Sequence, residues 1–272
     1  MGKWKKRMLY TLATVLLFYG VVVAAVGLLQ RRLMYFPSRF VSGVGEAIAA
    51  QEGFKPWRNA AGDGIGWRLP ATGTAVGTVL VMHGNAGCAL DRGYLAGPIQ
   101  QTGLLEVYLL EYPGYGSRGG APTLESILAA AEEAFGLLPK ENPVYLVSES
   151  IGTGAAAYLA KMHALQVMGL ALIAPYDDLA SVGQRQMPYL PVSWLLRDRF
   201  TPAAWLKDYQ GPVFVLVAGD DQIIPPVFAM RLYDSYAGPK RLQVIPGAGH
   251  NDIAAQSSTW WQEVLKFWQH PG

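Results

Sequence analysis

The segment Val144–Gly154, VYLVSESIGTG, places a serine at a corner between an apolar strand and a helix of small residues. A serine hydroxyl becomes a good nucleophile only when the chain holds it in the open and a base accepts its proton. A sharp strand-to-helix turn does the first, with the pattern G-x-S-x-G because larger residues would collide there. We therefore identify Ser150 as a candidate nucleophile on a nucleophile elbow, with Gly152 at the second glycine position.

The first glycine position of this pattern is occupied by Ser148, which is small enough for a tight turn. If Ser148 were the central serine, Leu146 and Ser150 would occupy the glycine positions, so Ser148 is excluded as the nucleophile. The replacement leaves an alternative open, because short motifs also arise by chance. In that alternative the protein keeps the fold and binds a partner without turnover.

Carboxylates follow the apolar strand expected at 212–218, at Asp220 and Asp221. The carboxyl ends of parallel strands meet at one edge of a sheet, so an acid placed here can approach the serine corner. Asp177 and Asp178, after the strand expected at 167–174, are the less favoured source. An acid can orient a histidine that accepts the serine proton.

His250 follows the strand expected at 241–245, in the glycine-rich loop that begins at Gly247. The other histidines lie elsewhere: His83 precedes the serine, His163 ends the next helix, and His270 is in the C-terminal tail. His250 is therefore the candidate general base.

A further strand, expected at 78–83, leads into the loop His83–Gly87, HGNAG. An attacking serine creates an oxyanion that needs hydrogen-bond donors, usually backbone N–H groups. The loop is a candidate source of one donor. We expect the His83 side chain to order the loop rather than to take part in chemistry.

Together these segments resemble the α/β-hydrolase superfamily, in which nucleophile, acid and histidine follow in this order, each after its own strand. The resemblance implies Asp221 as the acid, because it stands four residues before Pro225 as in the D-x-x-[VI]-P loop of hydrolases. It also implies an oxyanion hole made by the backbone N–H groups of Asn85 and Ile151, since HGNAG resembles the H-G-x-x-G loop.

Longer segments extend the resemblance, which covers the chain from about 54 to 268. Glu111–Gly120 is similar to the D-Y-R-G-Y-G-x-S segment of the superfamily, with Glu and Pro in place of Asp and Arg. Gln30–Ser38 and Met187–Phe200 are similar to membrane-anchored abhydrolase-domain proteins without a large lid. We accordingly expect a minimal lid between Pro175 and Ala203, and an open, shallow site.

Gly114–Gly119 also fits G-x-G-x-x-G, the dinucleotide fingerprint. That fingerprint requires its glycines on the first turn of a helix, where the pyrophosphate binds. Here Thr123 is the expected N-cap, so the glycines precede the helix, and the required acidic residue is missing. We predict no nucleotide binding and no other cofactor; no metal motif is present either.

The stretch 8–29 contains 22 residues without a charge, preceded by four basic residues. At about 1.5 Å per residue it can cross a hydrocarbon core of roughly 30 Å. It is longer than the apolar region of a cleaved signal peptide, and Arg31 and Arg32 follow as an interfacial stop. We predict an uncleaved anchor, with the N-terminus in the cytoplasm and the catalytic domain outside it.

Without residues 1–39 the chain has fifteen basic and twenty acidic residues, a net charge of −5. The body therefore carries no electrostatic footprint for nucleic acid. The single cysteine, Cys88, excludes an internal disulfide and is expected to be a small packed residue.

Strands alternate with helical patterns at 123–138, 151–163, 226–236 and 256–269, after a hairpin at 54–69. This alternation predicts an α/β fold with a mostly parallel central sheet and helices on both faces. We assign residues 1–39 to the anchor and 40–272 to one hydrolase domain.

The sequence thus predicts a membrane-anchored serine hydrolase for carboxylic esters or thioesters, with a small molecule, a lipid or an acylated protein as substrate. A non-catalytic binding protein and an acyltransferase remain alternatives.

Overall fold

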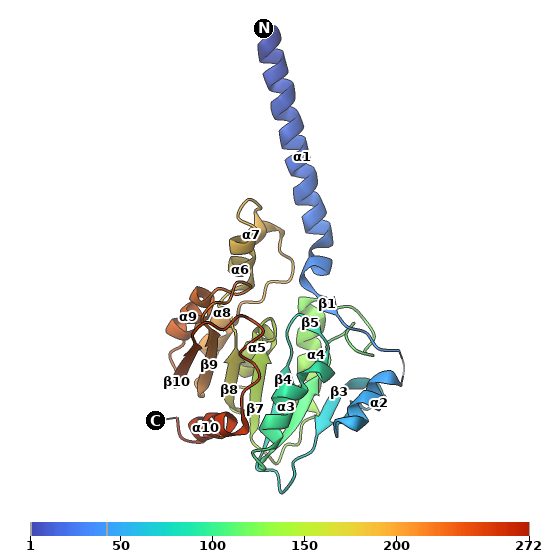
Figure 1. Ribbon diagram of the computed structural model, residues 1–272, viewed down its shortest axis with the longest axis vertical. Coiled ribbons are helices and arrows are strands. Elements are labelled where there is room, and N and C mark those ends of the chain that lie inside the picture. Colours follow the sequence, from blue (N-terminus) through green and yellow to red (C-terminus); the bar gives the residue numbers. More distant parts are fainter. Residues whose placement is uncertain (1, 42, 272) are drawn as a thin grey trace.

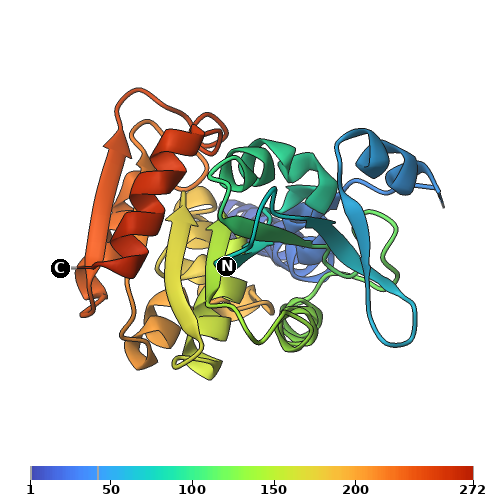
Figure 2. The same cartoon turned by 90° about the horizontal axis from the view of Figure 1, so that it is seen from below.

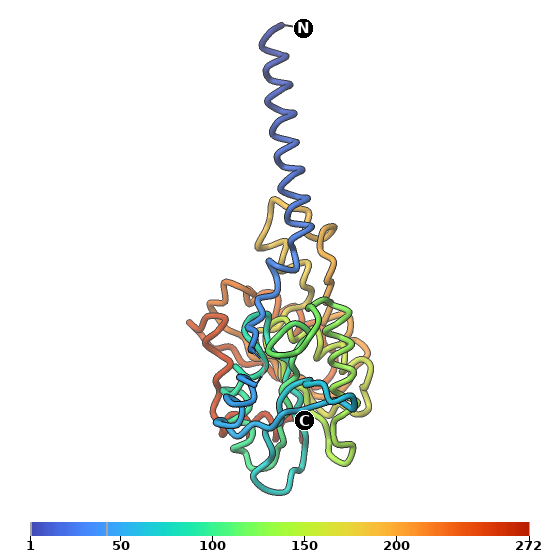
Figure 3. Tube along the Cα trace, turned by 90° about the vertical axis from the view of Figure 1, so that its right-hand side faces the viewer, coloured from blue at the N-terminus to red at the C-terminus, as the bar shows by residue number. Residues whose placement is uncertain are grey.

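The computed structural model describes residues 2–41 and 43–271. Helix α1 (Lys3–Met34) projects from the body, and its N-terminal end lies far from every other element (Figures 1 and 3). It contains the uncharged stretch expected from the sequence and is long and apolar enough to cross a membrane by length and composition. The remaining elements form the body.

Eight strands of the described chain make one sheet, in the order β10-β9-β8-β7-β4-β6-β3-β2. The strands β2 and β3 form the expected hairpin, β3 is antiparallel to β6, and the others run parallel. The mostly parallel sheet is therefore confirmed. The bounds are β2 Lys55–Arg58, β3 Gly64–Leu69, β4 Gly77–Met82, β6 Leu105–Leu110, β7 Val144–Glu149, β8 Val167–Ile173, β9 Val213–Ala218 and β10 Lys240–Ile245.

Helices cover both faces of the sheet (Figure 2). On one face lie α2 (Val44–Gln51), α3 (Gly93–Gln100) and α10 (Ser258–Gln269), and on the other lie α4 (Leu124–Gly136), α5 (Gly152–Met162), α8 (Pro202–Trp205) and α9 (Pro226–Ser235). Every residue of β4, β6, β7 and β9 is buried, which explains why these strands are mainly apolar and do not alternate with polar residues.

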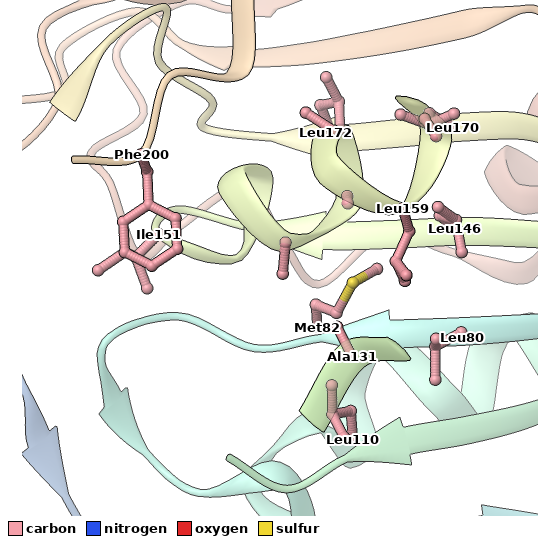
Figure 4. Packing of buried hydrophobic residues seen from close by; sticks show 14 of the residues in the cluster. Leu80, Met82, Leu110, Ala131, Leu146, Ile151, Leu159, Leu170, Leu172 and Phe200 are labelled. Carbon is pink, nitrogen blue, oxygen red and sulfur yellow. The ribbon is translucent and has the colours of Figure 1, made fainter. Parts of the chain in front are cut away.

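The core between the sheet and α5 is built by residues that lie side by side on neighbouring strands. Leu80, Leu146 and Leu170 face Leu159 of α5, and Ala131 of α4 packs beside Leu110 and Met82 (Figure 4). Small residues in α5 let the helix approach the sheet closely.

Shorter elements complete the fold. Between β8 and β9 lie α6 (Leu179–Gln186) and α7 (Val192–Leu195), which form the minimal lid beside α1 (Figure 1). The strands β1 (Phe36–Pro37) and β5 (Ala86–Gly87) pair in parallel, and the 3-10 helices are Ala89–Arg92 and Leu206–Asp208.

The glycines of the Gly114–Gly119 segment lie in the loop before α4. Gly114 and Gly116 have positive φ of 87° and 53°. The helix begins only after Thr123, whose hydroxyl accepts a hydrogen bond from the Ser126 backbone N–H, as expected for an N-cap. The segment therefore does not place its glycines on a helix turn that could hold a pyrophosphate.

Candidate active site

Ser150 lies at the turn between β7 and α5, in a backbone conformation that is rare for residues other than glycine. Its φ is +54°, in the left-handed region. The turn holds this conformation because the Ser150 N–H donates to the Ile173 carbonyl at 2.9 Å and the Ser150 carbonyl accepts from the Thr153 N–H at 3.0 Å. The strained turn directs the serine side chain away from the strand.

Gly152 is required where the turn passes β4. A Cβ at this position would lie 2.4 Å from the Met82 carbonyl oxygen, so no larger residue fits without moving the backbone. Ser148, at the other glycine position, is accommodated within β7 between Met82 and Leu172. It is completely buried, and its hydroxyl has no hydrogen-bond partner among the described residues.

Replacing Ser148 by alanine should therefore stabilise the protein. A buried hydroxyl without a partner costs roughly 1–3 kcal/mol, and Ser148→Ala removes it while keeping a small side chain. We expect Tm of the full chain in detergent to rise by about 2–4 °C for each kcal/mol gained, measured by thermal unfolding. A fall in Tm would show that the hydroxyl has a partner that stabilises the turn.

His250 contacts both Ser150 and Asp221. Its Nε2 lies 3.0 Å from the Ser150 Oγ, and its Nδ1 lies 2.6 Å from the Asp221 Oδ2. The other carboxylate oxygen, Oδ1, accepts hydrogen bonds from the N–H groups of Ile223 and Ile224, at 2.8 and 2.7 Å. Both residues of this contact are buried, with side chains 8% and 2% exposed. The structure thus brings three sequence-predicted residues into one chain of contacts.

The alternative acids do not take part in these contacts. Asp220 is exposed, and the hydrogen bond with the His250 Nδ1 is made by its neighbour. Asp178 is the N-cap of α6, where it accepts from the Ser181 N–H. Asp177 lies 3.8 Å from Arg231, and burial raises the pKa of Asp177. The carboxylate in contact with His250 is that of Asp221.

Of the remaining histidines, His270 is exposed at the end of α10, and the other two pack within the body. The His83 Nδ1 lies 2.7 Å from the Gly84 carbonyl, and the ring packs on Tyr112, which agrees with the expected role in ordering its loop. His163 stacks on Phe135 and contacts Glu132.

The N–H groups of Asn85 and Ile151 donate to no other described residue. Both residues border the same pocket as Ser150. The carbonyl and side chain of Asn85 hold the loop in place: the carbonyl accepts from the Phe36 N–H at 2.9 Å, and Nδ2 donates to the Met34 carbonyl at 2.9 Å. The loop that carries the first expected oxyanion donor is therefore fastened to the end of α1.

A buried ion pair behind the elbow was missed by sequence reasoning. The Glu149 carboxylate, next to Ser150, lies 3.0 Å from the Arg92 Nε and accepts from the Tyr94 hydroxyl at 2.7 Å. Arg92 also donates to the Ala86 carbonyl at 2.9 Å, which links the elbow to the loop His83–Gly87. No local pattern relates residues 92 and 149, so only the fold reveals this pair.

The pocket beside Ser150 has a volume of about 230 Å³, and its walls are mainly apolar. Helix α1, the lid helices α6 and α7, and the loop after β9 supply most of them: Val26, Leu33 and Met34; Leu179, Val182, Val192 and Leu195; Ile223 and Ile224. Such a pocket suits a hydrocarbon chain, with the polar reaction at one end. The expected lid segment therefore forms a wall rather than leaving the serine on a bare surface.

No group of His, Cys, Asp and Glu within residues 2–41 and 43–271 could hold a metal ion. Cys88 is buried, and burial raises the pKa of its thiol to about 12, so it packs as a neutral residue.

Comparison with known proteins finds similar sequences and similar structures, although no protein-family model matches the chain. An uncharacterized protein of Mycobacterium tuberculosis is 34% identical over 261 residues, covering 90% of this chain and 89% of its own. The lysophosphatidylserine lipase ABHD12 of Macaca fascicularis is 26% identical over 206 residues, which are 68% of this chain and about half (51%) of that protein.

A solved structure has a similar fold. An esterase of Pyrococcus furiosus superposes with a TM-score of 0.62 at 17% identity, covering 87% of this chain and all (100%) of that one. The chain belongs to the α/β-hydrolase superfamily.

Proposed function

We propose that this protein is a membrane-anchored serine hydrolase that cleaves carboxylic esters or thioesters through an acyl-enzyme. The observation that carries the proposal is the chain of contacts from Ser150 through His250 to Asp221. The sequence likeness to a lipase and the structural likeness to an esterase support the same class of reaction.

The proton chemistry follows from the contacts of His250. Ionised Asp221 can only accept hydrogen bonds, so the Nδ1 of His250 carries the proton and its Nε2 is a free acceptor. Nε2 takes the Ser150 proton as Oγ bonds to the acyl carbon, and the carbonyl electrons move to the oxygen. That oxyanion accepts hydrogen bonds from the N–H groups of Asn85 and Ile151.

Collapse of the intermediate breaks the bond to the leaving alcohol or thiol, which receives the proton from His250. Water then enters, loses a proton to the same Nε2, and attacks the acyl carbon. The second intermediate collapses as the bond from Oγ to the acyl carbon breaks, which releases the acid, and His250 returns the proton to the Ser150 Oγ. Asp221 remains ionised throughout, held by the N–H groups of Ile223 and Ile224. The two N–H bonds fix one carboxylate oxygen so that the other faces the imidazole.

Labelling with a fluorophosphonate probe tests this proposal. An activated serine displaces fluoride from phosphorus, and we expect one adduct, mapped by mass spectrometry to Ser150. Ser148→Ala is the matched control, since it changes the neighbouring serine and should label like the wild type. Folded protein that is not labelled, and that hydrolyses no p-nitrophenyl ester, would favour the non-catalytic binding protein that Ser148 left open.

We further propose that α1 is a membrane anchor for residues 40–272. Its apolar side chains are exposed over most of its length, for example Leu12, Leu16 and Phe18 at 54–70%. Exposed apolar surface of this extent is costly in water and is accommodated by a bilayer. The basic residues before the stretch favour a cytoplasmic N-terminus and a body outside the cytoplasm.

Cysteine accessibility tests the anchor and its orientation together. Leu165 is 97% exposed, whereas Cys88 is buried with a raised thiol pKa. A membrane-impermeant maleimide should therefore label Leu165→Cys in intact cells and leave the wild type unlabelled. Labelling only after permeabilisation would reverse the orientation, and release of the protein by alkaline carbonate would contradict the anchor.

A further inference from the structure

Helix α1 is joined to the body along one face of its second half. The Tyr19 hydroxyl donates to the Tyr189 carbonyl at 2.8 Å, and Gly27 faces Leu195, whose Cδ2 would lie 3.5 Å from an added Cβ. These positions lie on one side of the helix, about two helical turns apart. The exposed side of the same helix carries Leu28 and Leu29.

Polar contacts at the base of α1 lock this orientation. The Arg31 guanidinium donates to both oxygens of Asp198, at 3.0 and 2.9 Å, and the Asp198 side chain is completely buried. Gln30 donates to the Leu195 carbonyl at 3.0 Å and accepts from the Arg197 N–H at 2.7 Å. Helix and lid segment are thereby held together by both charge and backbone contacts.

The same face of α1 borders the pocket of Ser150. Val26, Gln30, Leu33 and Met34 are spaced by four, three and one residues, which places them on one helical stripe. Across the pocket lie the lid helices, so the acyl site is closed on one side by the helix that leads into the membrane. A simple tether would need no such contacts.

The lid reaches far along the apolar part of α1. Tyr19 lies ten residues before Leu29, which is about 15 Å along the helix axis. Its partner Tyr189 therefore lies beside the middle of the uncharged stretch. Tyr189 and Trp194 are 87% and 86% exposed, and insertion of their rings into a bilayer would remove this apolar surface from water. We call the segment that carries Tyr189 and Trp194 the lid tip. Where α1 crosses a bilayer, the lid tip enters the bilayer too.

We infer that α1 is a wall of the acyl-binding site and guides the acyl chain of a bilayer-resident ester or thioester from the membrane to Ser150. The inference rests on the proposed hydrolase function and adds the source of the substrate. The volume of about 230 Å³ lies below the roughly 300–1,000 Å³ of common ligand sites, and it suits a single chain. The lid tip and α1 together form the entry at the bilayer.

Tryptophan substitutions on two faces of α1 test the inference. Val26→Trp fills the pocket from its wall, whereas Val21→Trp adds the same group at a position that is 58% exposed and does not line the pocket. Full-length protein is reconstituted in phosphatidylcholine vesicles and assayed with p-nitrophenyl acetate and p-nitrophenyl palmitate, which share a leaving group.

We expect Val26→Trp to lower kcat/KM for the palmitate by about tenfold or more, because each buried methylene contributes roughly a factor of four. Its loss on the acetate should be clearly smaller than its loss on the palmitate, and both activities of Val21→Trp should stay within about twofold of the wild type. If Val26→Trp also loses acetate hydrolysis and fluorophosphonate labelling, Leu33→Phe, at a half-exposed pocket position, repeats the test.

Unchanged palmitate hydrolysis in the pocket-facing variants, or an equal loss in Val21→Trp, would contradict the inference that α1 forms a wall of the acyl-binding site. A wild-type protein that hydrolyses neither ester would overturn the proposed function, and the inference would fall with it. The acetate assay separates these results, because it needs Ser150 and its partners but not the length of the pocket.

Discussion

Ser150→Ala is expected to lower kcat for ester hydrolysis by about 10⁴-fold or more. The variant removes the atom that would form the acyl-enzyme, and His250 then has no nucleophile to deprotonate at 3.0 Å. Residual turnover of about 10³–10⁴ over water would come from the oxyanion donors and binding alone. Fluorophosphonate labelling should disappear together with turnover.

His250→Ala should cause a loss of similar size. The serine and the histidine act as one unit, so removing either one costs about as much as removing both. Ser148→Ala serves as the control, since it lies two residues away and should retain kcat within about twofold. A Ser150→Ala protein that keeps full activity or full labelling would remove the assignment. Active-site titration of each purified variant would exclude contamination by other hydrolases.

Asp221→Asn is expected to be almost as severe, with a loss of about 10⁴ in kcat. The amide can donate a hydrogen bond to Nδ1, which favours the tautomer that carries its proton on Nε2 and so cannot accept one from Ser150. Asp220→Asn is the matched control: it makes the same change on the next residue, whose side chain is exposed. We expect it to change kcat by less than about threefold.

Steady-state kinetics on p-nitrophenyl acetate measures both variants under the same conditions. The reverse ranking would mean that Asp220 orients His250 in the working enzyme. Equal, small effects would mean that the imidazole needs no carboxylate in this protein. Circular dichroism of both variants checks that the loop after β9 remains folded.

Much of the fold was predictable because strands buried on both faces must be continuously apolar. The strands expected at 78–83, 105–111 and 143–148 agree with β4, β6 and β7 to within one residue at either end. The short helices α2, α3, α6 and α7 were not predicted. An internal glycine interrupts α2 and α6, α3 contains Gly97 and Pro98, and α7 has only four residues, so packing against the body rather than intrinsic propensity holds them.

The order of Ser150, Asp221 and His250 along the chain was readable because each follows its own strand. The choice between Asp220 and Asp221 was supported only by a family resemblance, since neighbouring residues on a loop share their local sequence. Burial and the N–H groups of Ile223 and Ile224 distinguish Asp221 in the structure. Glu149 and Arg92 had no local signal, because their contact joins segments far apart in the chain.

By itself, the sequence determined an apolar helix followed by a mostly parallel α/β body with a serine elbow, because hydrophobic period and turn residues act over a few positions. Only the tertiary structure decided that α1 is part of the pocket. That result depends on Arg31 meeting Asp198 and on Gln30 meeting the lid backbone, across separations of more than 160 residues. Contacts of this range follow from how the sheet brings the lid to the base of α1, and no local pattern encodes them.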